Sequence, residues 1–153
     1  NVYGKNQYPE KIIPRFICQL LNGEKLTIHG SGLSRRNYMH VDDVTLAFET
    51  ILLKGEIGQI YNISGSHDNE YNVIDVAKTI ISLIYPNINV QEKEQLDKHL
   101  VYVEDRKFND ARYFISSDKL ELLGWKVNKT NFKENVRELI EWYKINKSRY
   151  GLF

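Results

Sequence analysis

Residues 30–55 read GSGLSRRNYMHVDDVTLAFETILLKG and pass from a turn through a strand into a helix. The stretch opens on a glycine-rich turn, and residues 37–41 then favour a short strand. Asp42 or Asp43 is expected to cap a helix that ends at Gly55. The apolar positions of this helix are Val44, Ala47, Phe48, Ile51 and Leu52. A strand that leads into an amphipathic helix is typical of α/β proteins.

The same alternation continues on both sides of this stretch. Apolar residues at helical spacing predict further helices over residues 11–21, 73–84, 118–123 and from 132 onward. Apolar or alternating runs predict further strands over residues 26–29, 59–63 and 100–103. Asn72 and Asn131 are expected to be the N-caps of two of the helices. The 153 residues are therefore expected to form one α/β or α+β domain with its own core.

The overall charge argues against nucleic acid as a partner. Lys and Arg together number 21, Asp and Glu number 20, and the formal net charge is +1. A nucleic-acid surface needs clustered Lys and Arg, which such a balanced chain does not offer. No apolar run approaches the roughly 20 residues that span a bilayer, so no membrane partner is expected either.

Cysteine usage indicates the kind of compartment in which the protein works. The only cysteine, Cys18, cannot form an internal disulfide and lies among apolar residues. It is expected to be a buried hydrophobe in a reducing, cytoplasmic compartment.

The first residue is Asn1 rather than Met, and it reads like the interior of a motif. We therefore expect the chain to be a piece of a longer protein.

Two charged segments are candidates for holding an anion. Arg36 follows a glycine turn on a predicted strand, where a guanidinium can approach a phosphate and bind it bidentately. Residues 104–113, EDRKFNDARY, have the composition of a loop that closes over an anionic ligand. On composition alone, a solvated arginine and a solvated loop are equally good interpretations.

Other polar and aromatic residues favour structural roles. The spacing of His29, His40, His67 and His99 provides no metal-binding pair, and with one cysteine a zinc site is not expected. His40 lies on a predicted strand and is expected to be packed or hydrogen-bonded rather than a general base. Trp125 and Trp142 are expected to lie in the core, and no metal ligand is assigned.

The motifs of the chain, taken in order, resemble a known enzyme family. They are residues 1–4 (NVYG), 8–14 (YPEKIIP), 36–43 (RNYMHVDD), 58–63 (GQIYNI), 105–113 (DRKFNDARY), 122–125 (LLGW) and 141–143 (EWY). Their order resembles the carboxyl-terminal half of the extended short-chain dehydrogenase/reductases. Within that superfamily of NAD-dependent epimerases and dehydratases, residues 9–14 and the Asp105–Arg106 pair most resemble the dTDP-glucose and UDP-glucose 4,6-dehydratases.

The resemblance implies a fold, a cofactor and a reaction. The fold is the carboxyl-terminal, substrate-binding part of a Rossmann-type α/β fold whose NAD-binding part is missing, and no Gly-x-Gly-x-x-Gly fingerprint occurs in the chain. The full-length protein would be a homodimer that uses NAD to convert dTDP- or UDP-glucose to the 4-keto-6-deoxyglucose nucleotide. The catalytic tyrosine–lysine pair would belong to the missing half, so residues 1–153 alone are expected to be inactive.

The resemblance also implies which residues bind the nucleotide-diphosphate sugar. Arg36 matches an arginine that binds the diphosphate, and the loop of Arg106 and Asn109 closes over it. The other matching positions are Asn1, Lys11, Ile12, Thr27, Ile28, His29 and Asn72. Among them, residues 27–29 match the strand that packs near the nucleotide base.

Three alternatives remain open on the sequence. The Phe108-Asn109-Asp110 form of the loop resembles eukaryotic and plant relatives, so the choice between dTDP and UDP is not decided. A UDP-sugar epimerase or decarboxylase of the same superfamily would share this half. A non-catalytic nucleotide-sugar-binding module is the alternative from another functional class.

Overall fold

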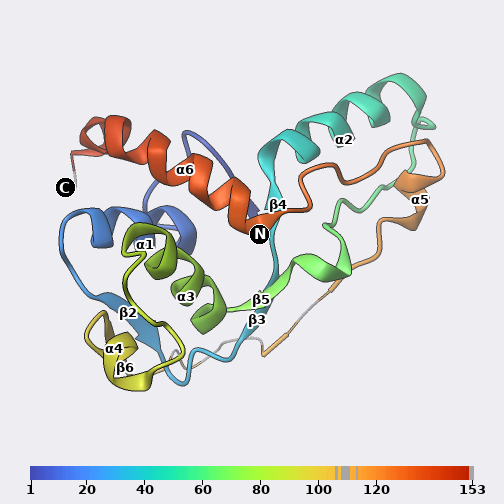
Figure 1. The fold of residues 1–153 in the computed structure, drawn as a ribbon. Coiled ribbons are helices and arrows are strands. Elements are labelled where there is room, and N and C mark those ends of the chain that lie inside the picture. The colour runs from blue at the N-terminus through green and yellow to red at the C-terminus, as the bar shows by residue number, and fades with distance from the viewer. Residues whose placement is uncertain (106, 108–110, 113, 152–153) are drawn as a thin grey trace.

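The computed structural model describes residues 1–105, 107, 111–112 and 114–151 (Figure 1). Its strands are β1 (Val2–Tyr3), β2 (Leu26–His29), β3 (Arg35–Asn37), β4 (Met39–His40), β5 (Glu70–Asn72) and β6 (Leu100–Val103). Its α-helices are α1 (Ile12–Leu21), α2 (Val41–Lys54), α3 (Val73–Ile84), α4 (Lys93–Asp97), α5 (Asp118–Glu121) and α6 (Phe132–Asn146). Two short 3₁₀ helices are η1 (His67–Asn69) and η2 (Lys147–Tyr150).

The strands form three separate pairs rather than one sheet. β1 pairs with β4 and β2 with β6 in parallel, while β3 and β5 are antiparallel. Parallel pairs need a crossover connection, and α1 and α3 lie within the two crossovers here. This mixture of parallel strands and helices agrees with the predicted α/β class.

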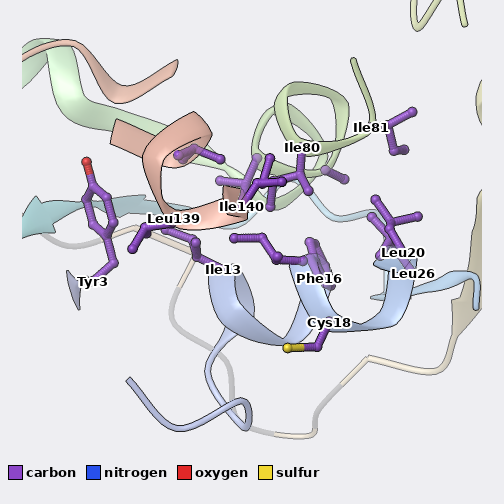
Figure 2. Packing of buried hydrophobic residues seen from close by; sticks show 14 of the residues in the cluster. Tyr3, Ile13, Phe16, Cys18, Leu20, Leu26, Ile80, Ile81, Leu139 and Ile140 are labelled. Atoms are coloured by element: carbon purple, nitrogen blue, oxygen red, sulfur yellow. The ribbon is translucent and has the colours of Figure 1, made fainter. Parts of the chain in front are cut away.

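The main core lies between three helices. Figure 2 shows Ile13 and Phe16 of α1 facing Ile80 of α3 and Ile140 of α6. All four side chains are buried, because the apolar residues of each helix recur on one face. Pro14 is tolerated in α1 because it lies in the first turn, where its missing N–H has no intrahelical partner.

The sequence predicted Cys18 and the two asparagine caps correctly. Cys18 is fully buried on α1, and burial raises the pKa of its thiol to about 11, so the inert thiol is favoured over the thiolate. The side chain of Asn72 accepts a hydrogen bond from the backbone N–H of Asp75 at 2.8 Å. Asn131 accepts one in the same way from Glu134 at 3.1 Å. Both asparagines therefore begin their helices as expected.

The N-cap of α2 differs from the prediction. The helix begins at Val41, so its cap is His40, whose Nδ1 accepts a hydrogen bond from the backbone N–H of Asp42. Asp42 and Asp43 both lie inside the first turn. The sequence prediction placed the cap too late because a histidine is a less usual cap than an aspartate.

A second, smaller core joins α2 to the segment around α5. Met39, Ala47, Leu120 and Trp125 are buried there. In Figure 1, α2 and α5 lie together on one side, away from α1, α3 and α6. The predicted apolar face of α2 is only partly buried: Ala47 is covered, whereas Phe48 and Leu52 are 63% and 85% exposed.

The predicted strand over residues 59–63 is not formed. The structure gives these residues no regular secondary structure, and Ile60 is 83% exposed. Its neighbour Tyr61 instead accepts a hydrogen bond at its hydroxyl from the backbone N–H of Glu56. An apolar run forms a strand only when a partner strand satisfies its backbone, and no described strand lies beside this one.

Within the described residues, no helix is long and apolar enough to cross a bilayer.

Candidate functional site

One cleft of about 340 Å³ gathers most of the predicted binding residues. It is lined by Asn1, Glu10, Lys11, Ile12, Arg15, Phe16, Thr27, His29, Ser34, Arg36, Tyr38 and Val73. Six of the predicted positions are in this set, namely Asn1, Lys11, Ile12, Thr27, His29 and Arg36. They come from four different parts of the chain, so the fold brings together residues that the sequence keeps apart.

The period of strand β2 decides which of its side chains reach the cleft. Successive side chains of a strand point to opposite faces. Thr27 and His29 are half-buried and line the cleft, whereas Ile28 between them is fully buried in the main core. The side chain of Ile28 therefore belongs to the core, and a contact between residue 28 and the ligand remains a prediction.

Strand β3 presents Arg36 to the cleft by the same alternation. Arg36 and Tyr38 line the cleft, while the side chain of Asn37 between them bonds elsewhere. Asn37 donates from Nδ2 to the carbonyl of Ser66 at 2.7 Å and accepts from the N–H of Gly65 at 2.9 Å. Arg36 donates from Nη1 to the carbonyl of Arg35 at 2.7 Å.

Asn1 is held against the same strand. Its backbone nitrogen donates to the carbonyl of Asn37 at 2.8 Å, and the N–H of Met39 donates to the carbonyl of Asn1 at 2.9 Å. The residue is thus fixed at the start of β1 by the β1–β4 pairing. The exposed residue Asn1 also lines the cleft.

The charges that line the cleft are mostly positive. Among the described residues of the lining, Lys11, Arg15 and Arg36 are cations, and Glu10 is the one acidic residue. The Nζ of Lys11 pairs with Oε1 of Glu10 at 2.9 Å, so this pair is neutral as a unit. Cations therefore outnumber carboxylates among the described residues of the lining, which favours an anionic ligand such as a diphosphate.

His29 has a buried polar atom in its ring. Its Nδ1 is buried and has no hydrogen-bond partner among the residues that the structure describes. Buried polar atoms are almost always paired in folded proteins. The nitrogen is shielded from solvent, and the residue as a whole is what lines the cleft.

A second cleft continues the first one. It measures about 380 Å³ and shares Asn1, Lys11, Ile12 and Tyr38 with it. Beyond these residues it is lined by Val2, Tyr3, Gln7 and Ile13. Two clefts that share a wall offer room for an elongated ligand with chemically different ends.

Asn72 does not line either cleft. Its side-chain oxygen caps α3, and its backbone pairs with Arg35 in the β3–β5 ladder. The next residue, Val73, lines the first cleft instead. The structure therefore gives Asn72 a capping role, and a contact with ligand remains a prediction.

Arg106 and Asn109 lie outside the described residues, but both flanks of their segment are placed. The side chain of Asp105 packs so closely on Gly30 that a Cβ atom there would lie 2.7 Å from Oδ2 of Asp105. On the other side, the N–H of Arg35 donates to the carbonyl of Ala111 at 2.8 Å. Asp105 and Ala111 therefore both lie beside the turn between β2 and β3.

A buried carboxylate fixes the far flank. Arg112 donates from Nε and Nη2 to the two oxygens of Glu70, at 2.6 and 2.9 Å. The side chain of Glu70 is only 8% exposed and also lies 3.8 Å from Nη1 of Arg35. A bidentate arginine–carboxylate pair has a defined geometry, so Arg112 is held firmly against β3 and β5.

Several lining residues were missed by sequence reasoning. Arg15 lies one helical turn after Lys11, and Tyr38 lies two residues after Arg36, so each shares a face with a predicted residue. This shared face is the sequence signal that could have identified Arg15 and Tyr38. Ser34 and Val73 had no comparable signal, because their place depends on how β3 and α3 pack.

The chain contains one Tyr-x-x-x-Lys spacing, at Tyr143 and Lys147, but the structure gives it no catalytic geometry. The ring of Tyr143 is fully buried, and its hydroxyl donates to the carbonyl of Gln7 at 2.5 Å. Burial raises the pKa of Tyr143 well above its usual range. Lys147 instead donates to the side chain of Asn22. No catalytic role is assigned to this pair.

Comparison with known proteins gives the site a family context. Residues 1–64 match the model of the NAD dependent epimerase/dehydratase family. The chain is 45% identical over 153 residues to the trifunctional UDP-glucose 4,6-dehydratase/UDP-4-keto-6-deoxy-D-glucose 3,5-epimerase/UDP-4-keto-L-rhamnose-reductase RHM3 of Arabidopsis thaliana, covering 99% of this chain and 21% of that protein. It is 46% identical over 146 residues to the dTDP-D-glucose 4,6-dehydratase of Mus musculus, covering 95% of this chain and 39% of that protein.

A solved structure has the same fold. The dTDP-glucose 4,6-dehydratase of Bacillus anthracis, solved in complex with NAD, superposes with a TM-score of 0.81 at 34% identity. The match covers 99% of this chain and 44% of that one. The chain thus spans less than half the length of the relatives that it matches. The resemblance inferred from the motifs is confirmed, and so is the Rossmann-type α/β fold class.

Proposed function

Because the chain is homologous to the 4,6-dehydratases of the NAD dependent epimerase/dehydratase family, we propose that it is the carboxyl-terminal, nucleotide-sugar-binding domain of such an enzyme. The whole protein would convert dTDP- or UDP-glucose to the 4-keto-6-deoxyglucose nucleotide. The observation that carries the proposal is the cationic cleft, where six predicted binding residues meet. Residues 1–153 would form one domain of the longer chain.

Each wall of the cleft suits a different part of a nucleotide sugar. Arg36 would bind the diphosphate through a charge-assisted, bidentate interaction. Thr27 and His29, the two half-buried residues of β2 that line the cleft, would lie beside the base. The amide of Asn1 would contact the hexose, towards the cleft that continues past Tyr3.

The contribution of this domain to catalysis would be binding energy. Contacts to the diphosphate and base are remote from the carbons that react. Such contacts can orient the hexose and so lower the barrier of a step to which they contribute no chemistry. In the reaction proposed for the whole enzyme, water is lost across C5 and C6 of the hexose, and NAD held by the rest of the protein would supply the hydride acceptor and donor.

The described residues do not fit NAD itself. A dinucleotide site needs a glycine-rich turn between a strand and the N-terminus of a helix. Gly30 and Gly32 lie in a turn between two strands, β2 and β3, and therefore present no helix N-terminus to a pyrophosphate. We assign NAD to the rest of the protein, and we expect the whole enzyme to be a cytoplasmic homodimer.

The proposal is tested by comparing two adjacent arginines in the intact protein. Arg36→Gln removes a guanidinium from the cleft, whereas Arg35→Gln removes one that faces Glu70. Isothermal titration with UDP and with dTDP should show affinity about tenfold or more weaker for Arg36→Gln, since a charged hydrogen bond is lost. Arg35→Gln should stay within about twofold of the parent protein.

The same titrations address the nucleotide preference, and analysis of the product addresses the reaction. The ratio of the affinities of the unsubstituted protein for UDP and for dTDP shows which nucleotide it prefers. Mass spectrometry of the sugar product should find the 4-keto-6-deoxyglucose nucleotide, whereas a 4-epimer would favour the epimerase alternative. An Arg36→Gln protein with unchanged affinity for both nucleotides would refute the assignment of this cleft.

A further inference from the structure

Arg15 is a cation of the cleft that neither the motifs nor the family resemblance assigns. It lies in the first turns of α1 and contributes to the lining of the first cleft. Its backbone N–H donates to the carbonyl of Lys11 at 2.9 Å, which places the two side chains one helical turn apart on the same face. The residue is exposed and lines the cleft.

The charge of Arg15 has no paired carboxylate in the described part of the chain. Lys11 is paired with Glu10, which is the only carboxylate among the described residues of the lining. Among the residues that the structure describes, none forms a hydrogen bond or an ion pair with the guanidinium of Arg15. Other arginines do pair with a carboxylate: Arg112 pairs with Glu70, and Arg137 pairs with Glu134.

The helix gives Arg15 a rigid base. Ile13 before it and Phe16 after it are buried in the main core, so the backbone at residue 15 is fixed by packing on both sides. A guanidinium on a rigid helix loses little freedom when it binds, and its planar donors match the oxygens of a phosphate. Arg36 approaches the same cleft from β3, a separate element.

We propose that Arg15 is a further nucleotide-binding residue, which supplies a second guanidinium to the diphosphate opposite Arg36. The proposal rests on the assignment of the cleft to a nucleotide sugar. It predicts that the diphosphate is held between α1 and β3, so the affinity depends on both elements. A solvated surface arginine would make no such contribution.

The test is nucleotide affinity in the intact protein that contains this chain. Arg15→Gln should weaken the binding of UDP and dTDP about tenfold or more, as measured by isothermal titration. It should also make the affinity less sensitive to salt, because one ionic contact is lost. Arg15→Lys keeps the charge but not the planar fork and should recover part of the affinity.

Arg137→Gln is the matched control. This arginine lies on α6, is partly exposed and pairs with Glu134, so its loss should leave nucleotide affinity unchanged. All variants should keep the parent melting temperature within about 2 °C, since each changes one surface side chain. Unchanged affinity in Arg15→Gln, or a loss with an unaltered salt dependence, would overturn the proposal.

The outcome separates this proposal from the assignment of the cleft. If Arg36→Gln loses affinity and Arg15→Gln does not, the cleft binds the nucleotide and only the role of Arg15 is wrong. If neither variant loses affinity, the nucleotide binds elsewhere and both proposals fail.

Discussion

At the scale of single residues, His40 shows how a buried imidazole can serve structure rather than catalysis. Its Nδ1 accepts a hydrogen bond from the backbone N–H of Asp42 at 3.2 Å, and its ring meets Tyr3 edge to face at 5.3 Å. Only a neutral imidazole can accept at Nδ1. Burial, more than any nearby charge, lowers the pKa of His40 and keeps it neutral.

We therefore predict that His40 makes the fold less stable in mild acid. The folded pKa lies below the ordinary value of 6.5, so the unfolded chain binds the proton more readily. Stability due to the neutral imidazole is present above pH 6.5 and is lost as the pH falls towards the folded pKa. The nearby ionisable groups are Asp42, Asp43, Lys129 and Glu138, and they partly offset one another.

The measurement compares His40→Asn with the parent protein. Asparagine keeps an acceptor at the N-cap but does not titrate. Melting temperatures at pH 7.5, 6 and 5 should fall more steeply for the parent protein than for the variant. Effects of His99 and other groups are common to both proteins and cancel. Parallel curves would show that His40 does not contribute.

The sequence could identify single site residues only where a local rule applied. Motif matching selected Arg36 and Lys11, and both line the cleft. The alternation of β2 would have excluded the side chain of Ile28, because its neighbours face the cleft. Whether Asn72 or Val73 reaches the cleft depends on how α3 packs against β2 and β5, which no local pattern encodes.

At the scale of elements, Asp43 joins α2 to the chain that precedes α6. Its two carboxylate oxygens accept hydrogen bonds from the N–H groups of Asn128 and Lys129, each at 3.0 Å. Its carbonyl accepts another from Nε1 of Trp125 at 3.0 Å. With 1% exposure, the carboxylate is a buried connector between elements rather than half of a catalytic pair.

We predict a large difference between two adjacent aspartates. Asp43→Ala leaves two backbone donors without their acceptor and should lower the free energy of unfolding by about 3 kcal/mol. Asp42→Ala removes an exposed carboxylate near His40 and should cost less than about 1 kcal/mol. Urea titrations followed by circular dichroism would measure both. Equal losses in the two variants would contradict the connector role of Asp43.

Helices and strands were predictable to different degrees for a physical reason. A helix satisfies its own backbone, so α1, α3 and α6 could be read from apolar spacing and caps. A strand needs a partner. Residues 26–29 and 100–103 find each other and form the predicted strands, while residues 59–63 have no partner among the described residues and remain irregular.

At the scale of the whole molecule, the two cores are unequal. The main core packs three helices together, whereas the small core covers only one side of α2. Phe48 and Leu52, one turn apart on α2, form an exposed apolar stripe, and Leu46 and Leu53 are exposed as well. Figure 1 shows α2 standing away from α1, α3 and α6. An exposed apolar patch of this kind marks a binding surface or favours association.

We therefore predict that the 153-residue chain binds an apolar dye through this stripe. The double variant Phe48→Glu and Leu52→Lys should lower the fluorescence of bound anilinonaphthalene sulfonate, because it replaces the stripe with a charged pair at helical spacing. The helical circular dichroism should not change, since neither side chain contributes to a core. Ile145→Lys, at an isolated apolar residue of α6 that is 80% exposed, is the control and should leave the fluorescence unchanged. If the control lowers the signal as much as the double variant does, dye binding comes from general exposure and α2 carries no special surface.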